Sequence, residues 1–305
     1  MRNKLWKKLI EPRILKRIYE ERLGEPLIYN LASVWMMFFG STRQKIEYDL
    51  IPRNAYSFCI LKAADLAKES GADRVAILEF GVAAGAGLLN MCYIADKVTK
   101  ATGIGFEIIG FDSGVGMPPP RDYRDHPEKY FTGDYPVTDK DALVRSLPPN
   151  ARIYFGPLTE TLKAAEAEIT SPLGFISIDV DYYWSTLEAL QILNWGPERY
   201  LPWVPMYFDD VQDLEDTPFA GELAALHDFN KQGVMRKISP MNFLAKRRIF
   251  KHAIWHDQVY FAHIFDHPWR AIENVARRRK VINVLTNPYL EGGLVKPRAE
   301  APSSL

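Results

Sequence analysis

Residues 75–87 read VAILEFGVAAGAG, an apolar run that leads directly into a glycine-rich turn. The run predicts a buried strand, and the apolar residues from Leu88 to Ile94 predict a helix after the turn. Glycine is needed where a turn takes a positive φ or where backbone must approach a ligand closely. In an open α/β sheet the first strand-to-helix turn borders the ligand crevice, so this stretch predicts a nucleotide-type binding loop. A glycine-rich turn without a ligand is the alternative.

Beyond this turn, short β-rich runs alternate with segments that favour helix or loop. The runs span residues 74–78, 107–111, 151–155, 174–178, 205–208, 234–238 and 258–265. Strands that alternate with helices are typical of a parallel sheet with right-handed crossovers, and the last two runs are expected to close its edge. The predicted fold class is a doubly wound, mostly parallel α/β sheet of seven strands.

The glycine spacing argues against a dinucleotide site and hence against an NAD-linked oxidoreductase. Read from Gly85 and Gly87, the G-x-G-x-x-G fingerprint requires its third glycine where Asn90 stands. The observed pattern is instead an acid, Glu79, two residues before Gly81, followed by glycines four and six residues after Gly81.

The second strand also ends in a carboxylate, Asp112. At that edge of a nucleoside-binding sheet a carboxylate can accept hydrogen bonds from ribose hydroxyls, so Asp112 is the predicted ribose ligand. A turn or helix-capping aspartate is the alternative. Residues 113–135 are rich in proline and aromatic residues, which is consistent with a lid, an acceptor wall or a packed surface loop.

Four aspartates follow the fourth and fifth strands, namely Asp179, Asp181, Asp209 and Asp210. Because parallel strand ends meet at one edge, these carboxylates are expected to converge beside the crevice. Like charges at such density favour a cation, and oxygen-only ligands favour Mg²⁺ before Ca²⁺ or Mn²⁺. An aspartate there can also take a proton as a base. The alternative is that some of them cap helices, with Asp181 the nearest to one.

The residues before the sheet predict an N-terminal helical arm over residues 1–50. Its first part is amphipathic and basic, which suits packing on its own domain, on a partner subunit or on a membrane surface. Residues 27–39 are more apolar and predict a buried helix or a dimer contact. A ligand-binding domain is expected over residues 51–268 and a C-terminal tail over 269–305.

The composition sets limits on partners and location. Among 305 residues, 38 Lys and Arg balance 38 Asp and Glu, so no global charge favours nucleic acid as a partner. The two cysteines lack a paired spacing, and no apolar run is long enough to cross a membrane, so a cytoplasmic protein is expected. Of the six histidines, His126 and His256 are secondary candidates for proton transfer.

Taken together, these motifs resemble the macrocin-type sugar O-methyltransferases, a family of class I S-adenosylmethionine-dependent methyltransferases. The likeness covers roughly residues 75–230. It rests on residues 78–87, 110–113, 116–118, 156–162, 178–186 and 208–210. This chain departs from the usual pattern at residues 113–116, where Ser-Gly-Val-Gly replaces Thr/Ser-Phe-x-Gly.

The resemblance implies the seven-stranded, Rossmann-like methyltransferase sheet, S-adenosylmethionine as methyl donor and Mg²⁺ as the ion. Residues assigned to cofactor binding are Glu79, Gly81, Ala83, Gly85, Gly87, Asp112, Ser113, Gly156, Leu158, Thr159 and Asp179. Residues assigned to the metal are Asp179, Asp181, Asp209 and Asp210. Asp181 is the expected catalytic base, with Asp179 as the other catalytic candidate.

The expected function is therefore methyl transfer to a hydroxyl of a small acceptor such as a sugar or phenol, assisted by a divalent ion. A homo-oligomer is one candidate assembly, and the sequence identifies neither the oligomeric state nor the acceptor. A non-catalytic S-adenosylmethionine-binding or assembly protein is the alternative, because it needs the glycine turn and Asp112 but not Asp181, Asp209 and Asp210.

Overall fold

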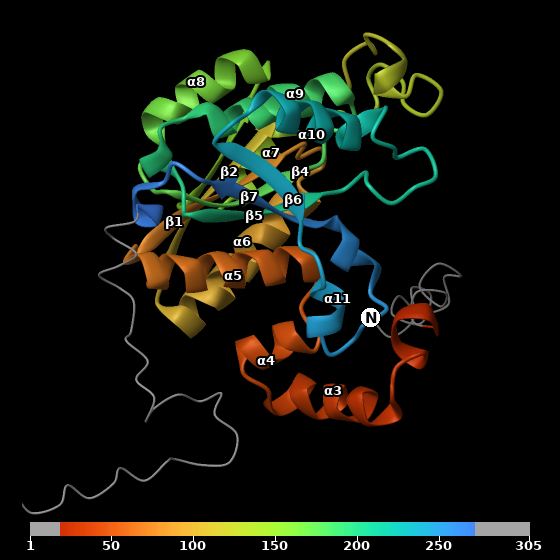
Figure 1. Ribbon diagram of the computed structural model, residues 1–305, viewed down its shortest axis with the longest axis vertical. Coiled ribbons are helices and arrows are strands. Elements are labelled where there is room, and N and C mark those ends of the chain that lie inside the picture. The colour runs from red at the N-terminus through yellow and green to blue at the C-terminus, as the bar shows by residue number, and fades with distance from the viewer. Residues whose placement is uncertain (1–18, 272–305) are drawn as a thin grey trace, which may run out of the picture.

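The computed structural model describes residues 19–271, in which one sheet is covered by helices on both faces (Figure 1). The strands are β1 (Arg74–Phe80), β2 (Gly105–Asp112), β3 (Ala151–Phe155), β4 (Leu173–Ile178), β5 (Trp203–Phe208), β6 (Arg236–Pro240) and β7 (Val259–Ile264). The α-helices are α3 (Leu27–Phe39), α4 (Thr42–Glu47), α5 (Asn54–Ser70), α6 (Ala86–Thr102), α7 (Lys140–Ser146), α8 (Leu158–Glu168), α9 (Tyr183–Leu190), α10 (Gly221–Gln232) and α11 (Leu244–Arg247).

Shorter helical turns connect these elements. They are the π-turn η1 (Tyr19–Leu23) and the 3-10 turns η2 (Tyr123–Asp125), η3 (Gln191–Asn194), η4 (Pro197–Arg199), η5 (Ile254–Gln258) and η6 (Pro268–Arg270). Most of the predicted basic arm, residues 1–18, and most of the predicted tail, residues 272–305, lie outside the described residues.

The seven strands lie in the order β3-β2-β1-β4-β5-β7-β6. Strands β1 to β5 are parallel, and β7 is antiparallel to both β5 and β6. This confirms the predicted doubly wound, mostly parallel sheet, whose last two strands extend one edge. The chain crosses from β3 back to β4 beside β1, so the topological switch point, where ligands bind in such sheets, lies between β1 and β4.

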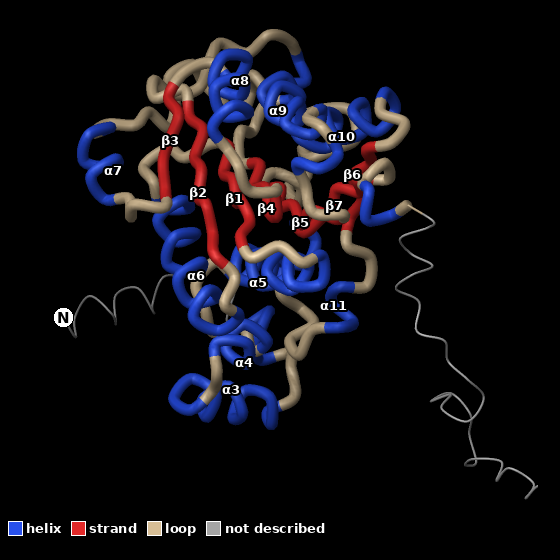
Figure 2. The backbone as a smooth tube through the Cα atoms, turned by 90° about the vertical axis from the view of Figure 1, so that its left-hand side faces the viewer, coloured by secondary structure: helices blue, strands red, loops and turns tan. Residues whose placement is uncertain are grey.

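The alternation of side chains along β1 builds the two cores. Val75 and Ile77 belong to the core that contains the buried faces of α5 and α6. Ala76, Leu78 and Phe80 belong to the core that contains residues of α8, α9 and α10. Figure 2 shows the two helical layers on opposite sides of the sheet. Because side chains alternate faces along a strand, Glu79 points toward α5 and α6.

Helix α5 runs from Asn54 to Ser70, as the apolar spacing of residues 54–70 and the glycine after them predict, and Gly71 ends it with φ 84°. That left-handed conformation is open to glycine at little cost, which explains why the helix stops there. The two cysteines, Cys59 and Cys92, lie in α5 and α6.

Helix α3 is not the buried helix that its sequence suggested. Ser33 is its single buried residue, while Trp35, Phe38 and Phe39 expose 61%, 70% and 70% of their surface. The reason is that α3 packs beside α4 at the far end of the molecule, with no further layer of residues 19–271 over it (Figures 1 and 2). A contact with a second copy stays a prediction. Within residues 19–271, no helix is both long and apolar enough to cross a membrane.

Residues 19–50 are held by hydrogen bonds to the segment between β6 and β7. Arg248, which is 4% exposed, donates to the backbone oxygens of Ile46 and Glu47 and to Asp49 Oδ1 at 2.6, 3.1 and 2.8 Å. Glu25 accepts hydrogen bonds from the backbone N–H of His252 and from its Nδ1. The segment between β6 and β7 therefore holds the helices that precede the sheet.

Candidate functional site

A cavity of about 980 Å³ opens at the carboxyl ends of β1, β2, β4 and β5. Its walls include the turn after β1, the loop 113–135 and the start of α8. The predicted site residues that line it are Glu79, Gly81, Ala83, Gly87, Asp112, Ser113, Gly156, Leu158, Asp179, Asp181, Asp209 and Asp210. Gly85 and Thr159 do not line it.

The glycines of the turn make room chiefly for other parts of the protein. At Gly81, where φ is 84°, a Cβ would overlap the backbone oxygen of Asp179. At Gly87 a Cβ would overlap the carboxylate of Glu79. These glycines let β1, β4 and α6 approach closely, and that approach brings Glu79 and Asp179 to one cavity.

Asp112 holds the turn in place. Its Oδ2 accepts hydrogen bonds from the backbone N–H groups of Val82 and Ala83 at 2.9 and 2.8 Å, and its Oδ1 accepts one from Gly114 at 2.6 Å. The turn-aspartate alternative is thus present in the structure. Its carboxylate also lines the cavity, where the predicted ribose contact stays a prediction.

Glu79 is a buried acid at the base of the cavity. The hydroxyl of Tyr56, on α5, donates to Glu79 Oε1 at 2.7 Å and lies 2.7 Å from Ser177 Oγ. The other carboxylate oxygen, Oε2, is buried without a hydrogen-bond partner in the described structure. Burial raises the pKa of Glu79 to about 7, because the hydrogen bond from Tyr56 only partly replaces the water that the charged form loses.

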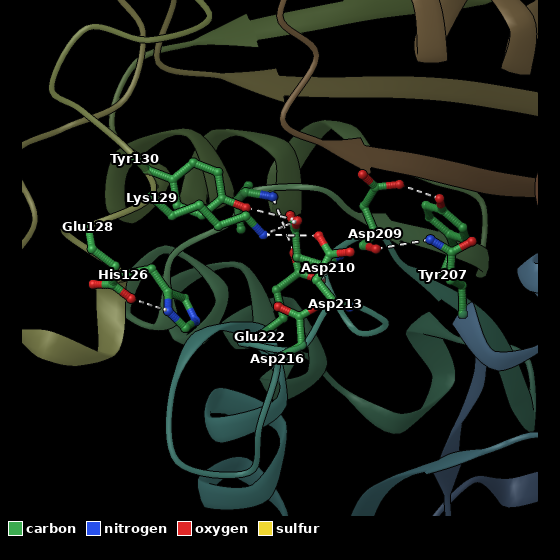
Figure 3. A network of polar contacts seen from close by, with 12 residues as sticks. His126, Glu128, Lys129, Tyr130, Tyr207, Asp209, Asp210, Asp213, Asp216 and Glu222 are labelled. Atoms are coloured by element: carbon green, nitrogen blue, oxygen red, sulfur yellow. Dashed lines mark hydrogen bonds and ion pairs between the residues drawn. The ribbon is translucent and has the colours of Figure 1, made fainter. Parts of the chain in front are cut away.

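Three of the four strand-end aspartates converge as predicted, and Figure 3 shows two of them, Asp209 and Asp210, with their polar neighbours. One carboxylate oxygen each from Asp179, Asp209 and Asp210 lie within 4.8 Å of one another. The Tyr207 hydroxyl donates to Asp209, and the Tyr130 hydroxyl donates to Asp210 Oδ1 at 2.9 Å. Burial and the neighbouring acids raise the pKa of Asp179 well above its usual value, which is the expected result of like charges in one pocket.

Asp181 lines the cavity beside this group without being part of it. Burial, followed by the charge of Asp210, raises the pKa of Asp181 to about 7. Helix α9 begins after Tyr182, and the backbone N–H of Trp184 in its first turn donates to Asp125 Oδ1 at 3.1 Å, so Asp125 caps this helix and the helix-capping alternative for Asp181 is wrong.

Glu222 is an acid that the sequence analysis missed. It lies in the first turn of α10, is fully buried, and accepts hydrogen bonds from the backbone N–H groups of Val180 and Asp210 at 3.3 and 3.2 Å. Burial, then Asp210, raises the pKa of Glu222 well above the usual value. Its hydrogen bonds connect the residues that follow β4 to those that follow β5, and so hold the aspartates of the two segments close to one another. A helical glutamate carries no sequence signal of this role.

The loop 113–135 forms a wall of the cavity, as one of its three interpretations expected. Tyr130, which is buried, packs against Met117 and Tyr182 and reaches Asp210. Lys129 Nζ lies 3.6 Å from Asp210 Oδ1. The aromatic residues of this loop are visible in the sequence, whereas the aspartate that each one contacts depends on the folded chain.

The backbone is strained around the cavity. Arg53, Ala83, Tyr135 and Asp181 are non-glycine residues with φ between 45° and 58°, and all four line it. Each such residue costs on the order of 1 kcal/mol, and such strain gathers at functional sites. The geometry therefore marks this cavity as a site independently of its acids.

The two histidines considered for proton transfer do not line the cavity. His126 Nδ1 lies 3.2 Å from Glu128 Oε1, and His256 is buried against Trp255. His252 and His256 are not a zinc pair on a helix, because His252 precedes η5 and binds Glu25.

No protein-family model matches the chain, and no curated protein sequence matches it. Solved structures resemble it at low identity. The O-methyltransferase NovP is 16% identical, with 59% of this chain and 72% of that chain covered and a TM-score of 0.40. The calicheamicin methyltransferase CalS11 is 16% identical, with 72% and 85% covered and a TM-score of 0.45. An O-methyltransferase from Bacillus cereus, in complex with SAH, is 11% identical, with 81% and 94% covered and a TM-score of 0.36. At these values the likeness says nothing about what this chain binds or catalyses.

Proposed function

We propose that this chain is an S-adenosylmethionine-dependent O-methyltransferase that methylates a hydroxyl of a small acceptor with the help of a divalent ion. One observation carries the proposal. The glycine turn after β1, the strand-end Asp112 and the group of Asp179, Asp209 and Asp210 line a single cavity at the switch point of the sheet. The motif resemblance to sugar O-methyltransferases supports the same function.

The residues at the turn fit a nucleoside that carries an amino acid. Glu79 Oε2 is a buried acceptor without a partner, which suits an ammonium or hydroxyl donor. Asp112 lies at the end of the neighbouring strand, where a ribose is expected. The cavity, at about 980 Å³, is at the upper end of the range of about 300–1,000 Å³ for ligand sites, so a donor and an acceptor fit together.

The aspartates fit a hard divalent ion. Their donor set is oxygen only, and Asp210 Oδ2 is buried without a hydrogen-bond partner in the described residues. Asp179, Asp209 and Asp210 would hold the ion. When bound, Mg²⁺ would lower the pKa of an acceptor hydroxyl. Asp181, beside this group, would be the fourth ligand or the base.

The chain itself would position the acceptor and remove a proton. S-adenosylmethionine supplies a methyl group on a sulfonium, so the chain needs no further activating group for the methyl. Asp181 would accept the hydroxyl proton as the oxygen–methyl bond forms and the sulfur–methyl bond breaks. Proton removal of this kind contributes about 10²- to 10⁴-fold, and alignment of the reacting atoms about 7–11 kcal/mol in favourable cases.

Calorimetric titration of the full chain tests the donor and the ion. We expect binding of S-adenosylmethionine and S-adenosylhomocysteine but not of NAD, and Mg²⁺ binding that EDTA reverses. Binding of NAD alone would overturn the proposal. Binding of S-adenosylhomocysteine with no response to Mg²⁺ and no turnover on any acceptor would favour the non-catalytic alternative.

Asp209→Asn tests the aspartate group. Because one ligand charge is lost, we expect Mg²⁺ to bind about tenfold or more weakly and turnover on sugar and phenol acceptors to disappear, while S-adenosylhomocysteine binds as before. Turnover is followed as S-adenosylhomocysteine release. Glu215→Gln is the control, because Glu215 is exposed on the same loop and does not line the cavity. Unchanged turnover in Asp209→Asn would contradict the role of Asp209.

A further inference from the structure

Arg53 presents a cation to the cavity. It precedes α5, has φ 54° and ψ 68°, and its guanidinium carbon lies 5.1 Å from the ring centroid of Tyr56. Within residues 19–271 this guanidinium makes no hydrogen bond and no ion pair. A guanidinium carries five N–H donors in a planar fork, so a half-buried one without partners is matched to a ligand with several acceptors.

The surroundings of Arg53 are acidic. Tyr56, over which it lies, donates to Glu79, and both Glu79 and Asp179 line the same cavity. Burial by itself lowers the pKa of Arg53, but Tyr56, Glu79 and Asp179 raise it overall, so the group stays charged. One wall of the cavity therefore offers a cation and acids side by side. This is the arrangement that recognises the carboxylate and ammonium of an α-amino acid.

We propose that Arg53 binds the α-carboxylate of the methyl donor's amino-acid end. The proposal rests on the proposed function, since it assigns one more residue to the same site. Arg53 would form two parallel N–H···O bonds to the carboxylate, the geometry in which a guanidinium binds best. Glu79, whose Oε2 has no partner in the described structure, would face the ammonium.

The position of Arg53 favours the donor over the acceptor. Arg53 approaches from α5, on the face of β1 to which Glu79 points, at the base of the cavity. The cations expected near an acceptor come instead from the loop 113–135, where Lys129 faces Asp210 and Arg121 pairs with Glu188. Arg53 also takes a left-handed backbone conformation, with φ 54°, although it is not a glycine.

The test compares two ligands that differ only in the carboxylate. Calorimetry on the full chain measures S-adenosylhomocysteine and its decarboxylated form, 5′-deoxy-5′-(3-aminopropylthio)adenosine. We expect the parent chain to prefer S-adenosylhomocysteine by about 10- to 100-fold, the range for hydrogen bonds to a charged group. In Arg53→Met the preference should fall to about threefold or less, because the carboxylate no longer has its partner. Methionine keeps a side chain of similar length on the same backbone.

Two further variants separate binding from folding. Arg53→Lys keeps the charge without the planar fork and should show an intermediate preference. Arg121→Met removes another cavity arginine and should leave the preference intact. The proposal is overturned if Arg53→Met keeps the parental preference, including the case in which it weakens both ligands equally. If the parent chain binds neither ligand, the proposed function itself fails, and this outcome is distinct from the first.

Discussion

Single side chains at the cavity differ from the same residue types in water. Glu79 and Asp181 have a pKa raised to about 7, in both cases by burial first. A carboxyl group with a pKa near neutrality can accept and release a proton at the pH of a cell. The identity of these acids is visible in the sequence, whereas the burial that shifts the pKa depends on the elements around them.

His256 illustrates the same principle away from the site. It is 4% exposed, and neither ring nitrogen has a hydrogen-bond partner in the described residues. Burial, and then Arg248, lowers the pKa of His256 from 6.5 to about 4. Above about pH 6.5 both the folded and unfolded forms are neutral, so the free energy of unfolding is unaffected. As the pH falls toward 4, the unfolded chain binds a proton that the folded chain does not, and stability is lost.

We therefore expect His256→Phe to reduce this loss. At about pH 5 the parent should have lost about 2 kcal/mol through His256, and the variant should not. At about pH 7.5 the variant should be at least as stable as the parent, because no hydrogen bond is removed. Urea unfolding at both pH values measures the difference. A difference between variant and parent that does not change with pH would contradict the assignment.

The strand, turn and helix formed by β1 and α6 show what the glycines do. Gly81 lets the turn pass the backbone of Asp179, and Gly87 lets α6 approach Glu79. The sequence predicts glycine here for a positive φ or for close approach to a ligand, with a turn that binds no ligand as the alternative. The structure shows a second reason for glycine at these two positions, because a Cβ at either one would overlap a neighbouring part of the protein.

Gly81→Ala and Gly71→Ala separate backbone strain from steric overlap. Both glycines have φ 84°, but a Cβ at Gly71 meets nothing within 4 Å, whereas at Gly81 it overlaps a backbone oxygen. We expect Gly71→Ala to cost about 1 kcal/mol from strain alone. Gly81→Ala should cost on the order of 3 kcal/mol more, because backbone must move.

Chemical denaturation measures both costs. Equal costs, within about 0.5 kcal/mol, would show that the turn can shift away from Asp179 without loss. In that case the close approach of β1 and β4 would not explain the need for glycine at residue 81.

Over the molecule as a whole, one buried ion pair joins the two ends of the described chain. Arg248 Nη2 lies 2.8 Å from Asp49 Oδ1, and both side chains are almost fully buried, at 2% and 3% exposed. Trp255 Nε1 donates to Asp49 Oδ2 at 3.4 Å. The helices before the sheet are thus held by the segment between β6 and β7, about two hundred residues later in the chain. No local sequence pattern predicts these contacts.

Arg248→Met should destabilise the fold by about 3–5 kcal/mol, because it leaves the buried carboxylate of Asp49 without its partner. Arg43→Met is the matched control. Its partner is Asp65, and the two side chains are 46% and 33% exposed, so its cost should stay below about 1 kcal/mol. Urea unfolding of both variants gives the comparison. Similar costs for the two would show that Arg248 does not hold the early helices.

Much of this architecture follows from local patterns in the chain. Strand positions, the end of α5 at Gly71 and the turn after β1 were predicted, because side-chain periodicity and glycine conformation act over a few residues. The convergence of strand-end aspartates was predicted as well, since a parallel sheet brings its carboxyl ends to one edge.

Folding in three dimensions decided the rest. Tertiary folding brings Arg53 to the cavity and places Glu222 against the residues that follow β4. It also makes Asp112 accept hydrogen bonds from the backbone of the glycine turn, and it leaves the apolar α3 exposed. Each of these outcomes depends on which distant element docks against a residue. Burial and charge are properties of that docking, and a sequence pattern that acts over a few residues does not contain them.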